Sequence, residues 1–300
     1  MALLPHWLKD LTPEMIKRAE VELGETPEKR KLAIEELRQL IDDEEDFQVP
    51  NDEQFLQRFL RAKKYEVKRA FKSLKLYYSL KASYPDVLNI LPSDVEHILK
   101  KDIMMVTPKR GLNAEGVLII LLGVVDDDWS VSADDVTRAA FISADIGVEA
   151  EASQICGSSV IFDLNGVTWR TLVRLSTPKV LSLMAKGLQD AWPHRINGIH
   201  VVNEPSYFTY TYNILRPMLS RKMRKRVHFH GKNLESLHKH FPTEILPEAL
   251  GGKAGKKDFK EFRENILDRE KLGERLRDFV YEGVKFPEAN SESFESESYN

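Results

Sequence analysis

Apolar positions repeat at two different spacings along the chain. In the first ninety residues they recur every three or four positions, the spacing of one helix face. Thr12-Pro13-Glu14 and Thr26-Pro27-Glu28 each place a capping hydroxyl before a proline and an acid, which predicts two helix starts. Asp52 predicts a third start, and a fourth helix is expected over Val67–Ala82. This part of the chain is predicted to be a helical bundle.

After Pro92 short β-rich runs alternate with helical segments. Strands are expected at residues 103–106, 117–125, 159–164, 198–202 and 227–230. Helices are expected to begin at Ser132 and Thr177, the second running to Trp192. Strands separated by helices of this length indicate βαβ units. The fold class is therefore predicted to be α/β, with a mostly parallel sheet flanked by helices.

The end of the chain has a third pattern. Residues 256–285 are charged and carry apolar positions at helical spacing, which predicts one amphipathic helix. Residues 286–300 include an acidic, serine-rich end and are expected to be disordered. The expected domains are thus 1–90 and 91–255, followed by the 256–285 helix and the 286–300 tail.

One helical stretch has two apolar stripes instead of one. Its apolar positions are Phe208, Tyr212, Leu215, Leu219 and Met223 on one stripe and Tyr207, Thr211, Ile214 and Met218 on the other. The stretch ends in the basic run 221–226. A face this wide needs apolar partners on two sides. It is either a core helix with a solvated basic end or a movable lid that meets lipid or membrane.

Composition narrows the functional classes. The 300 residues carry a formal net charge of −3, so nothing global favours nucleic acid, and any basic surface must be local. The single cysteine, Cys156, excludes an intramolecular disulfide and fits a reducing compartment. The apolar run at the start of the sequence is too short for a signal peptide, because charged residues follow it closely. The longest apolar run, Val117–Val125, is shorter than the ~20 residues of a membrane span. We expect a cytoplasmic protein that touches membranes at their surface.

Enzyme signatures are missing. The chain has no G-x-S-x-G and no G-x-G-x-x-G after a strand, and Lys257 stands where a phosphate loop needs Ser or Thr. His228 and His230 share one face of a strand, yet no third ligand is suggested nearby. They are interpreted as structural or surface histidines. No catalytic set, metal site or cofactor is predicted.

Two helical segments carry more small and flexible apolar residues than a surface helix requires. Residues 136–146 include Ala140 and Ala144, and residues 180–188 include Met184 and Gly187. Small side chains leave room and methionine adapts to irregular shapes. These faces either line a cavity or pack tightly in a core.

The order of several motifs resembles the CRAL-TRIO, or Sec14-like, lipid-transfer family. The likeness covers about residues 55–252 and is strongest for the branch of α-tocopherol transfer protein, cellular retinaldehyde-binding protein and the clavesins. The matching motifs are Phe55-Leu56-Gln57-Arg58-Phe59-Leu60-Arg61-Ala62, Ile161-Phe162-Asp163-Leu164-Asn165-Gly166, Trp192-Pro193, Asn203-Glu204-Pro205, His228-Phe229-His230-Gly231, Phe241-Pro242 and Gly251-Gly252.

The resemblance implies a carrier that is not an enzyme. One small hydrophobic ligand, tocopherol-, retinoid- or isoprenoid-like, would lie between the sheet and a lid that opens at a membrane. Ala140 and Ala144 stand where that family has hydroxyl groups near the tocopherol head, and Asp145 matches a family acid. The expected pocket residues are Ala140, Phe141, Ala144, Asp145, Ile161, Leu183, Met184, Gly187, Leu188, Tyr207, Phe208, Thr211, Ile214, Leu215 and Met218.

The resemblance also implies a cleft for phosphoinositide headgroups. Position by position, its cations would be Lys63, Arg195, Lys222 and Arg226, while Asn197 replaces a basic residue of the family. Lys222 and Arg226 are i, i+4 neighbours on a helix and would converge on one phosphate.

Three functional hypotheses follow. The first is a monomeric lipid-transfer protein with peripheral, reversible membrane association. The second is a phosphoinositide-binding trafficking adaptor whose cavity is not essential, and the third is an α/β enzyme. The sequence leaves open the ligand, its orientation, the preferred phosphoinositide and the role of the tail.

Overall fold

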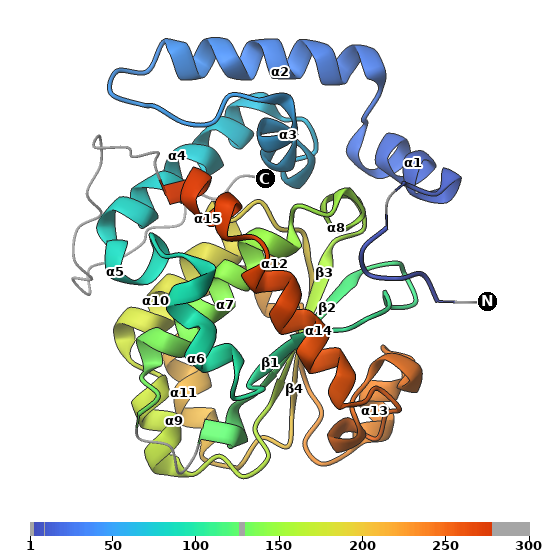
Figure 1. Ribbon diagram of the computed structural model, residues 1–300, viewed down its shortest axis with the longest axis vertical. Coiled ribbons are helices and arrows are strands. Elements are labelled where there is room, and N and C mark those ends of the chain that lie inside the picture. The colour runs from blue at the N-terminus through green and yellow to red at the C-terminus, as the bar shows by residue number, and fades with distance from the viewer. Residues whose placement is uncertain (1–2, 9, 126–129, 278–300) are drawn as a thin grey trace.

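The chain folds as a helical bundle set against a sheet that is covered by helices. The computed structural model describes residues 3–8, 10–125 and 130–277 (Figure 1). The N-terminal helices are α1 (Pro13–Arg18), the π-helical η1 (Ala19–Leu23), α2 (Pro27–Asp42), α3 (Glu53–Ala62), α4 (Val67–Ser83) and α5 (Pro85–Leu88).

Side-chain caps start these helices where the sequence predicts. The hydroxyl of Thr12 accepts a hydrogen bond from the backbone N–H of Met15 at 3.3 Å, and Thr26 accepts one from Lys29 at 3.2 Å. Asp52 caps α3 in the same way, through the N–H of Phe55 at 3.0 Å. Each cap satisfies a donor that has no partner within the helix. The predicted starts at Thr12, Thr26 and Asp52 are confirmed.

The strands form one mostly parallel sheet. They are β1 (Met104–Val106), β2 (Gly116–Leu121), β3 (Ser158–Asp163), β4 (Ile196–Val202) and β5 (Val227–Phe229), in the order β1-β2-β3-β4-β5. Only the β1–β2 pair is antiparallel, and the predicted α/β class is confirmed. The predicted strand 117–125 is too long, since Leu122–Val125 turns into a 3-10 helix, η3.

Strand alternation gives the sheet two different faces. In register, Leu118 lies beside Val160 and Ile199, and these three side chains face the cavity described below. The next residues of β2 and β3, Ile119 and Ile161, point to the other face of the sheet, where they are buried and do not line the cavity.

Helices α7, α9, α10 and α11 lie on the cavity side of the sheet, and α13 lies on the opposite side (Figure 1). On the cavity side the elements are α7 (Ala133–Gly147), α9 (Trp169–Leu175), α10 (Pro178–Lys186) and the π-helical η4 (Gly187–Ala191), while α8 (Glu151–Cys156) packs against α1 and α3 of the N-terminal bundle. Neither α8 nor α9 was expected from the sequence; the predicted helix that begins at Ser132 stops at Gly147.

The remaining elements connect or close the domain. They are η2 (Pro92–Val95), α6 (Glu96–Leu99), α13 (Leu234–His238), η6 (Thr243–Ile245), η7 (Glu248–Leu250), α14 (Lys256–Leu267) and α15 (Glu270–Arg277). The single helix predicted over 256–285 is wrong within the described part, since α14 and α15 are separate helices. Residues 278–285 and the predicted disordered tail lie outside the described residues.

The lid stretch is not one continuous helix. α11 spans Phe208–Leu215, a 3-10 turn η5 spans Arg216–Met218, and α12 spans Arg221–Arg224. Pro217 lies in that turn and has no N–H to donate to the preceding helical turn. The helix therefore ends before the basic run, and α12 stops short of Arg226, so the i, i+4 pairing expected on one helix does not apply. Within the described residues no helix is long and apolar enough to cross a membrane.

Candidate functional site

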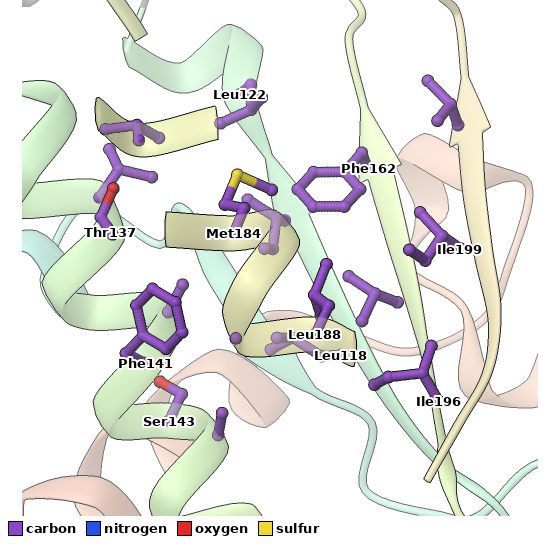
Figure 2. A pocket seen from close by; sticks show the side chains of 18 of the residues that line it. Leu118, Leu122, Thr137, Phe141, Ser143, Phe162, Met184, Leu188, Ile196 and Ile199 are labelled. Atoms are coloured by element: carbon purple, nitrogen blue, oxygen red, sulfur yellow. The ribbon is translucent and has the colours of Figure 1, made fainter. Parts of the chain in front are cut away.

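A cavity of about 240 Å³ lies between the sheet and the helices. Figure 2 shows its walls: Thr137 and Phe141 come from α7, Met184 and Leu188 from α10 and η4, and Phe162 from β3. Helix α11 contributes Phe208, Thr211, Tyr212 and Leu215. The lining is overwhelmingly apolar, which is the environment of a hydrophobic ligand.

Most polar groups in this wall already have partners. The hydroxyls of Thr137 and Ser143 donate to carbonyls one turn back in α7, at 2.7 and 2.6 Å. Nε2 of His194 lies 2.9 Å from the carbonyl oxygen of Ala144, and burial lowers the pKa of His194 to about 4. Its ring is therefore neutral at physiological pH and adds no charge to the cavity.

The structure brings most of the expected pocket residues together. Those that line the cavity are Ala140, Phe141, Ala144, Met184, Gly187, Leu188, Phe208, Thr211 and Leu215. Those that do not line it are Asp145, Ile161, Leu183, Tyr207, Ile214 and Met218.

Three of these corrections come from residues that face away from the cavity. Asp145 is buried behind the wall, where its carboxylate accepts hydrogen bonds from Tyr77 and Trp192. Ile161 lies on the opposite face of β3, because its neighbours at 160 and 162 face inward. Leu183 packs into the core shared with the N-terminal bundle.

The other three corrections concern the lid. The hydroxyl of Tyr207 donates to the carbonyl oxygen of Val167 at 2.5 Å, so this ring anchors the start of the lid against the loop before α9. Ile214 and Met218 point outward and are 50% and 39% exposed. The sequence therefore predicted that these three lid residues line the pocket, whereas none of them does.

Residues that sequence reasoning missed come mainly from the strands. Leu118, Val160 and Ile199 line the cavity at alternate positions of β2, β3 and β4. Their alternation with Ile119 and Ile161 is visible in the sequence, but only the register shows which set faces inward. His6 also lines the cavity, and no local pattern signals that the N-terminal segment reaches it.

A cationic cluster lies at the end of the sheet where β4 begins. Lys63 donates a hydrogen bond to the carbonyl oxygen of Asp190 at 3.2 Å, and Arg226 donates one to that of Ile196. Arg195 forms an ion pair with Glu22 at 2.9 Å. These interactions fix the positions of the three side chains, so that their charged groups stay close to one another.

The cations of this cluster lie close enough to lower one another's pKa values. Burial, followed by the charges of Arg226, Lys64, Arg69 and Arg195, lowers the pKa of Lys222. Burial, followed by the charge of Arg195, lowers the pKa of Arg226. Neither Lys222 nor Arg226 forms an ion pair with any described residue. The cluster therefore combines the four expected cations with two that were missed, Lys64 and Arg69.

The backbone beside this cluster is unusual. Lys64 and Tyr65 both have positive φ, 55° and 60°, at the end of α3. Left-handed conformations in residues other than glycine cost about 1–3 kcal/mol each and persist where the surroundings enforce them. Here the N–H of Tyr65 donates to the carbonyl oxygen of Leu60 at 2.7 Å, which closes the turn that presents Lys63 and Lys64.

An apolar patch covers the outer face of the lid and of α9. Its members are Trp169, Val173, Tyr210, Ile214 and Met218, which are 39–66% exposed. Trp169 and Tyr210 touch edge to face, with ring centroids 5.7 Å apart. Contiguous exposed apolar side chains of this kind mark an interaction surface.

Histidines gather on the other face of the sheet. His200 stacks between His228 and His230, and Nδ1 of His200 lies 3.0 Å from Nε2 of His230. Burial lowers the pKa of His200 to about 3. Within the described parts of the chain, no three His, Cys, Asp or Glu side chains are placed to hold a metal ion.

Comparison with known proteins gives a consistent family. The CRAL/TRIO domain model matches residues 100–252, and the model of the CRAL/TRIO N-terminal domain matches residues 33–76. Clavesin-2 of Homo sapiens is 32% identical over 271 residues, which is 89% of this chain and 82% of that protein. Alpha-tocopherol transfer protein-like of Mus musculus is 31% identical over 283 residues, or 93% of this chain and 79% of that protein. A crystal structure of Sfh5 shares the fold, with a TM-score of 0.50, 14% identity and coverage of 85% of this chain and 92% of that one.

Proposed function

The chain belongs to the CRAL/TRIO family, and on this premise we propose that it transfers lipid between membranes. It takes one small hydrophobic molecule, tocopherol-, retinoid- or isoprenoid-like, into the cavity under α11 and exchanges it at phosphoinositide-containing membranes. On this proposal, the protein is a monomer that works in the cytoplasm and associates with membranes peripherally and reversibly.

The apolar cavity beneath the lid carries this proposal. A cavity of about 240 Å³ is large for a packed core, in which voids above the size of one water molecule are few. Its size lies just below the range of about 300–1,000 Å³ found for pockets of drug-sized ligands. One small lipid is the occupant that such a lining favours.

The lid supplies a route into the cavity. Its inner face, with Phe208, Thr211 and Leu215, covers the cavity, while Tyr210 and Ile214 on the outer face are exposed. Opening α11 in water would expose both faces, which is unfavourable in proportion to apolar area. At a bilayer the same surfaces would enter the headgroup region. The membrane thereby favours the open state.

The cationic cluster supports recognition of anionic headgroups. Lys222 and Arg226 repel each other and their neighbours, so a phosphate that binds between them relieves this repulsion. Each cation near an anionic surface contributes about 1 kcal/mol, and four contribute about 4. Attraction of this size recruits the protein without making membrane binding permanent.

A trafficking adaptor whose cavity is not essential is the second candidate, because the same cations would serve it. Native mass spectrometry and organic extraction of the purified protein separate the two functions. Lipid transfer predicts one co-purified lipid per chain and movement of a fluorescent retinoid or tocopherol from donor to acceptor vesicles. A protein that carries no lipid, takes none from vesicles and still binds phosphoinositide vesicles would be the adaptor.

A further inference from the structure

The cavity has a polar end that is closed by the N-terminal segment. Residues 3–8 run beside the turn after β1, with a bridge between Pro5 and Lys109. The N–H of His6 donates to the carbonyl oxygen of Pro108 at 2.9 Å, and the N–H of Arg110 donates to that of Leu4 at 2.8 Å. These backbone bonds hold His6 against the cavity.

Three polar side chains converge at this end, in front of Gly116. A Cβ atom built on Gly116 would lie 3.1 Å from Cε1 of His6, 3.4 Å from Oγ of Ser158 and 3.5 Å from Oγ of Ser153. All four residues line the cavity. Since Cε1 lies between the two ring nitrogens, both nitrogens of His6 are close to this point.

The imidazole of His6 has no hydrogen-bond partner. The residue is only 4% exposed, and neither Nδ1 nor Nε2 is paired with any described residue. Buried polar groups are almost always paired, so an unpaired one calls for a partner that is absent from the protein itself. Thr137, Ser143 and His194, in contrast, are satisfied by backbone carbonyls.

Arg110 determines which hydrogen-bonding groups Ser153 and His6 can offer to a ligand. Its buried guanidinium donates to Oγ of Ser153 at 3.2 Å and to the carbonyl oxygen of His6 at 2.7 Å. The hydroxyl oxygen of Ser153 thus accepts from Arg110, which leaves the hydroxyl proton of Ser153 to be donated into the cavity. Burial and the charges of Arg110 and Arg269 lower the pKa of His6 to about 3, so its ring is neutral. A neutral imidazole offers one donor and one acceptor.

We propose that His6, with Ser153 and Ser158, binds the hydroxyl group of a lipid alcohol whose hydrocarbon part extends towards Met184 and Phe162. A hydroxyl both donates and accepts, so it can donate to the unprotonated ring nitrogen of His6 and accept from Ser153. An aldehyde cannot donate, and an alkane satisfies neither nitrogen. The inference rests on the proposed lipid-transfer function and adds the headgroup and its orientation to it.

A matched ligand series tests this proposal. Hexadecanol, hexadecanal, palmitate and hexadecane compete with a fluorescent retinoid for the full-length protein. We expect wild-type protein to prefer hexadecanol to hexadecane by about tenfold, the effect of one well-made hydrogen bond with an otherwise unpaired buried partner. His6→Phe removes this preference, while His6→Gln, which keeps a donor and an acceptor, restores part of it. His97→Phe, at an exposed position outside the cavity, leaves the preference unchanged.

A purely structural role for His6 predicts the opposite behaviour in the ligand-free protein. If His6 only held the N-terminal segment, His6→Phe would lower the melting temperature. On our proposal the variant is at least as stable as wild type, because it removes two unpaired nitrogens. Gly116→Ala, whose methyl group occupies the point of convergence, reduces hexadecanol binding more than hexadecane binding.

The outcomes separate the two levels of the proposal. If the wild-type protein binds none of the four compounds, lipid transfer itself is wrong. If it binds all four equally, or prefers palmitate, the hydroxyl site is wrong and lipid transfer stands. Loss of the preference in Thr211→Val but not in His6→Phe would place the headgroup under the lid and would also overturn the inference.

Discussion

Nε1 of Trp192 donates a hydrogen bond of 2.5 Å to Oδ1 of Asp145, and both side chains are buried. Tyr77 of the N-terminal bundle donates to the other carboxylate oxygen at 2.9 Å. Trp192 also contacts Phe141, with ring centroids 4.4 Å apart, and both rings line the cavity. One carboxylate therefore connects the helical bundle to the wall of the lipid cavity from behind.

Replacing Asp145 should mainly affect stability. Asp145→Ala leaves the donors of Tyr77 and Trp192 unpaired and removes the charge that opposes the lowering of the Lys81 pKa by burial. We expect a loss of about 3–5 kcal/mol in the free energy of unfolding, measured by urea denaturation. Asp145→Asn keeps an acceptor and should lose less. If the Asp145→Ala protein is as stable as wild type and its ligand preference changes, Asp145 contacts the ligand and its role is not mainly structural.

Removing two cations should weaken membrane binding without emptying the cavity. Lys222→Ala combined with Arg226→Ala is expected to cost about 2 kcal/mol, or about thirtyfold in partitioning to phosphoinositide vesicles. Lys100→Ala with Lys260→Ala changes the net charge equally at exposed positions outside the cluster and serves as the control. Equal partitioning of the two double variants would reject the cluster as the headgroup site. High salt should reduce the difference.

The outer face of the lid should matter only at the bilayer. Ile214 is 50% exposed, and its replacement by serine should change the free energy of unfolding little. We expect vesicle partitioning to fall about fivefold, which corresponds to about 1 kcal/mol for a half-exposed side chain that the bilayer would bury. Val21→Ser, at a position that is 74% exposed on η1, is the matched control. An unchanged Ile214→Ser protein in vesicle sedimentation would show that the patch does not touch lipid.

Acid should destabilise the ligand-free protein. Burial holds the pKa of His6 at about 3 and that of His194 at about 4, whereas both are about 6.5 in the unfolded chain. Below pH 6.5 the unfolded state takes up protons that the folded state does not, so stability falls as pH falls towards about 4. His6 and His194 alone predict a loss of about 2 kcal/mol between about pH 6 and pH 5, and His200, whose pKa burial lowers to about 3, adds to this loss.

Urea denaturation at about pH 7, 6 and 5 measures this slope, and His6→Phe should make it shallower. Asp145 acts in the opposite sense: burial raises its pKa, so the folded state gains this proton first as pH falls. Its contribution offsets part of the histidine effect at the acid end. A flat profile in wild-type protein would contradict the neutral, buried state of both histidines.

Local signals predicted the parts of the fold that local interactions determine. The caps at Thr12, Thr26 and Asp52 are bonds between residues three apart, so the sequence contains the whole interaction. Helix α9 spans only Trp169–Leu175, too short for a clear period, and it was missed. The lid stretch was recognised as unusual and was treated as one helix that runs into the basic run, whereas α11 ends at Leu215, two residues before Pro217.

The candidate site shows where such reasoning stops. Periodicity tells which residues share a face and does not tell which face lines the cavity. It therefore could not test Ile161, which the family resemblance placed in the pocket, against its neighbour Val160, which lines the cavity instead. The same ambiguity applies to Ile214, which was expected to face the cavity and instead lies exposed on the outer face of the lid. His6 reaches the cavity only through bonds to the turn around Pro108, a contact that no neighbouring residue signals.

The attachment of the N-terminal segment has a consequence for biosynthesis. Leu4 and His6 are synthesised about a hundred residues before their backbone partners, which lie around residues 108–110. Trp7 packs against the guanidinium of Arg269, 4.4 Å from its ring, near the far end of the described chain. The polar end of the cavity therefore cannot be fully closed until the chain has been translated beyond Arg269. Until then, the contacts that close this end of the cavity are incomplete.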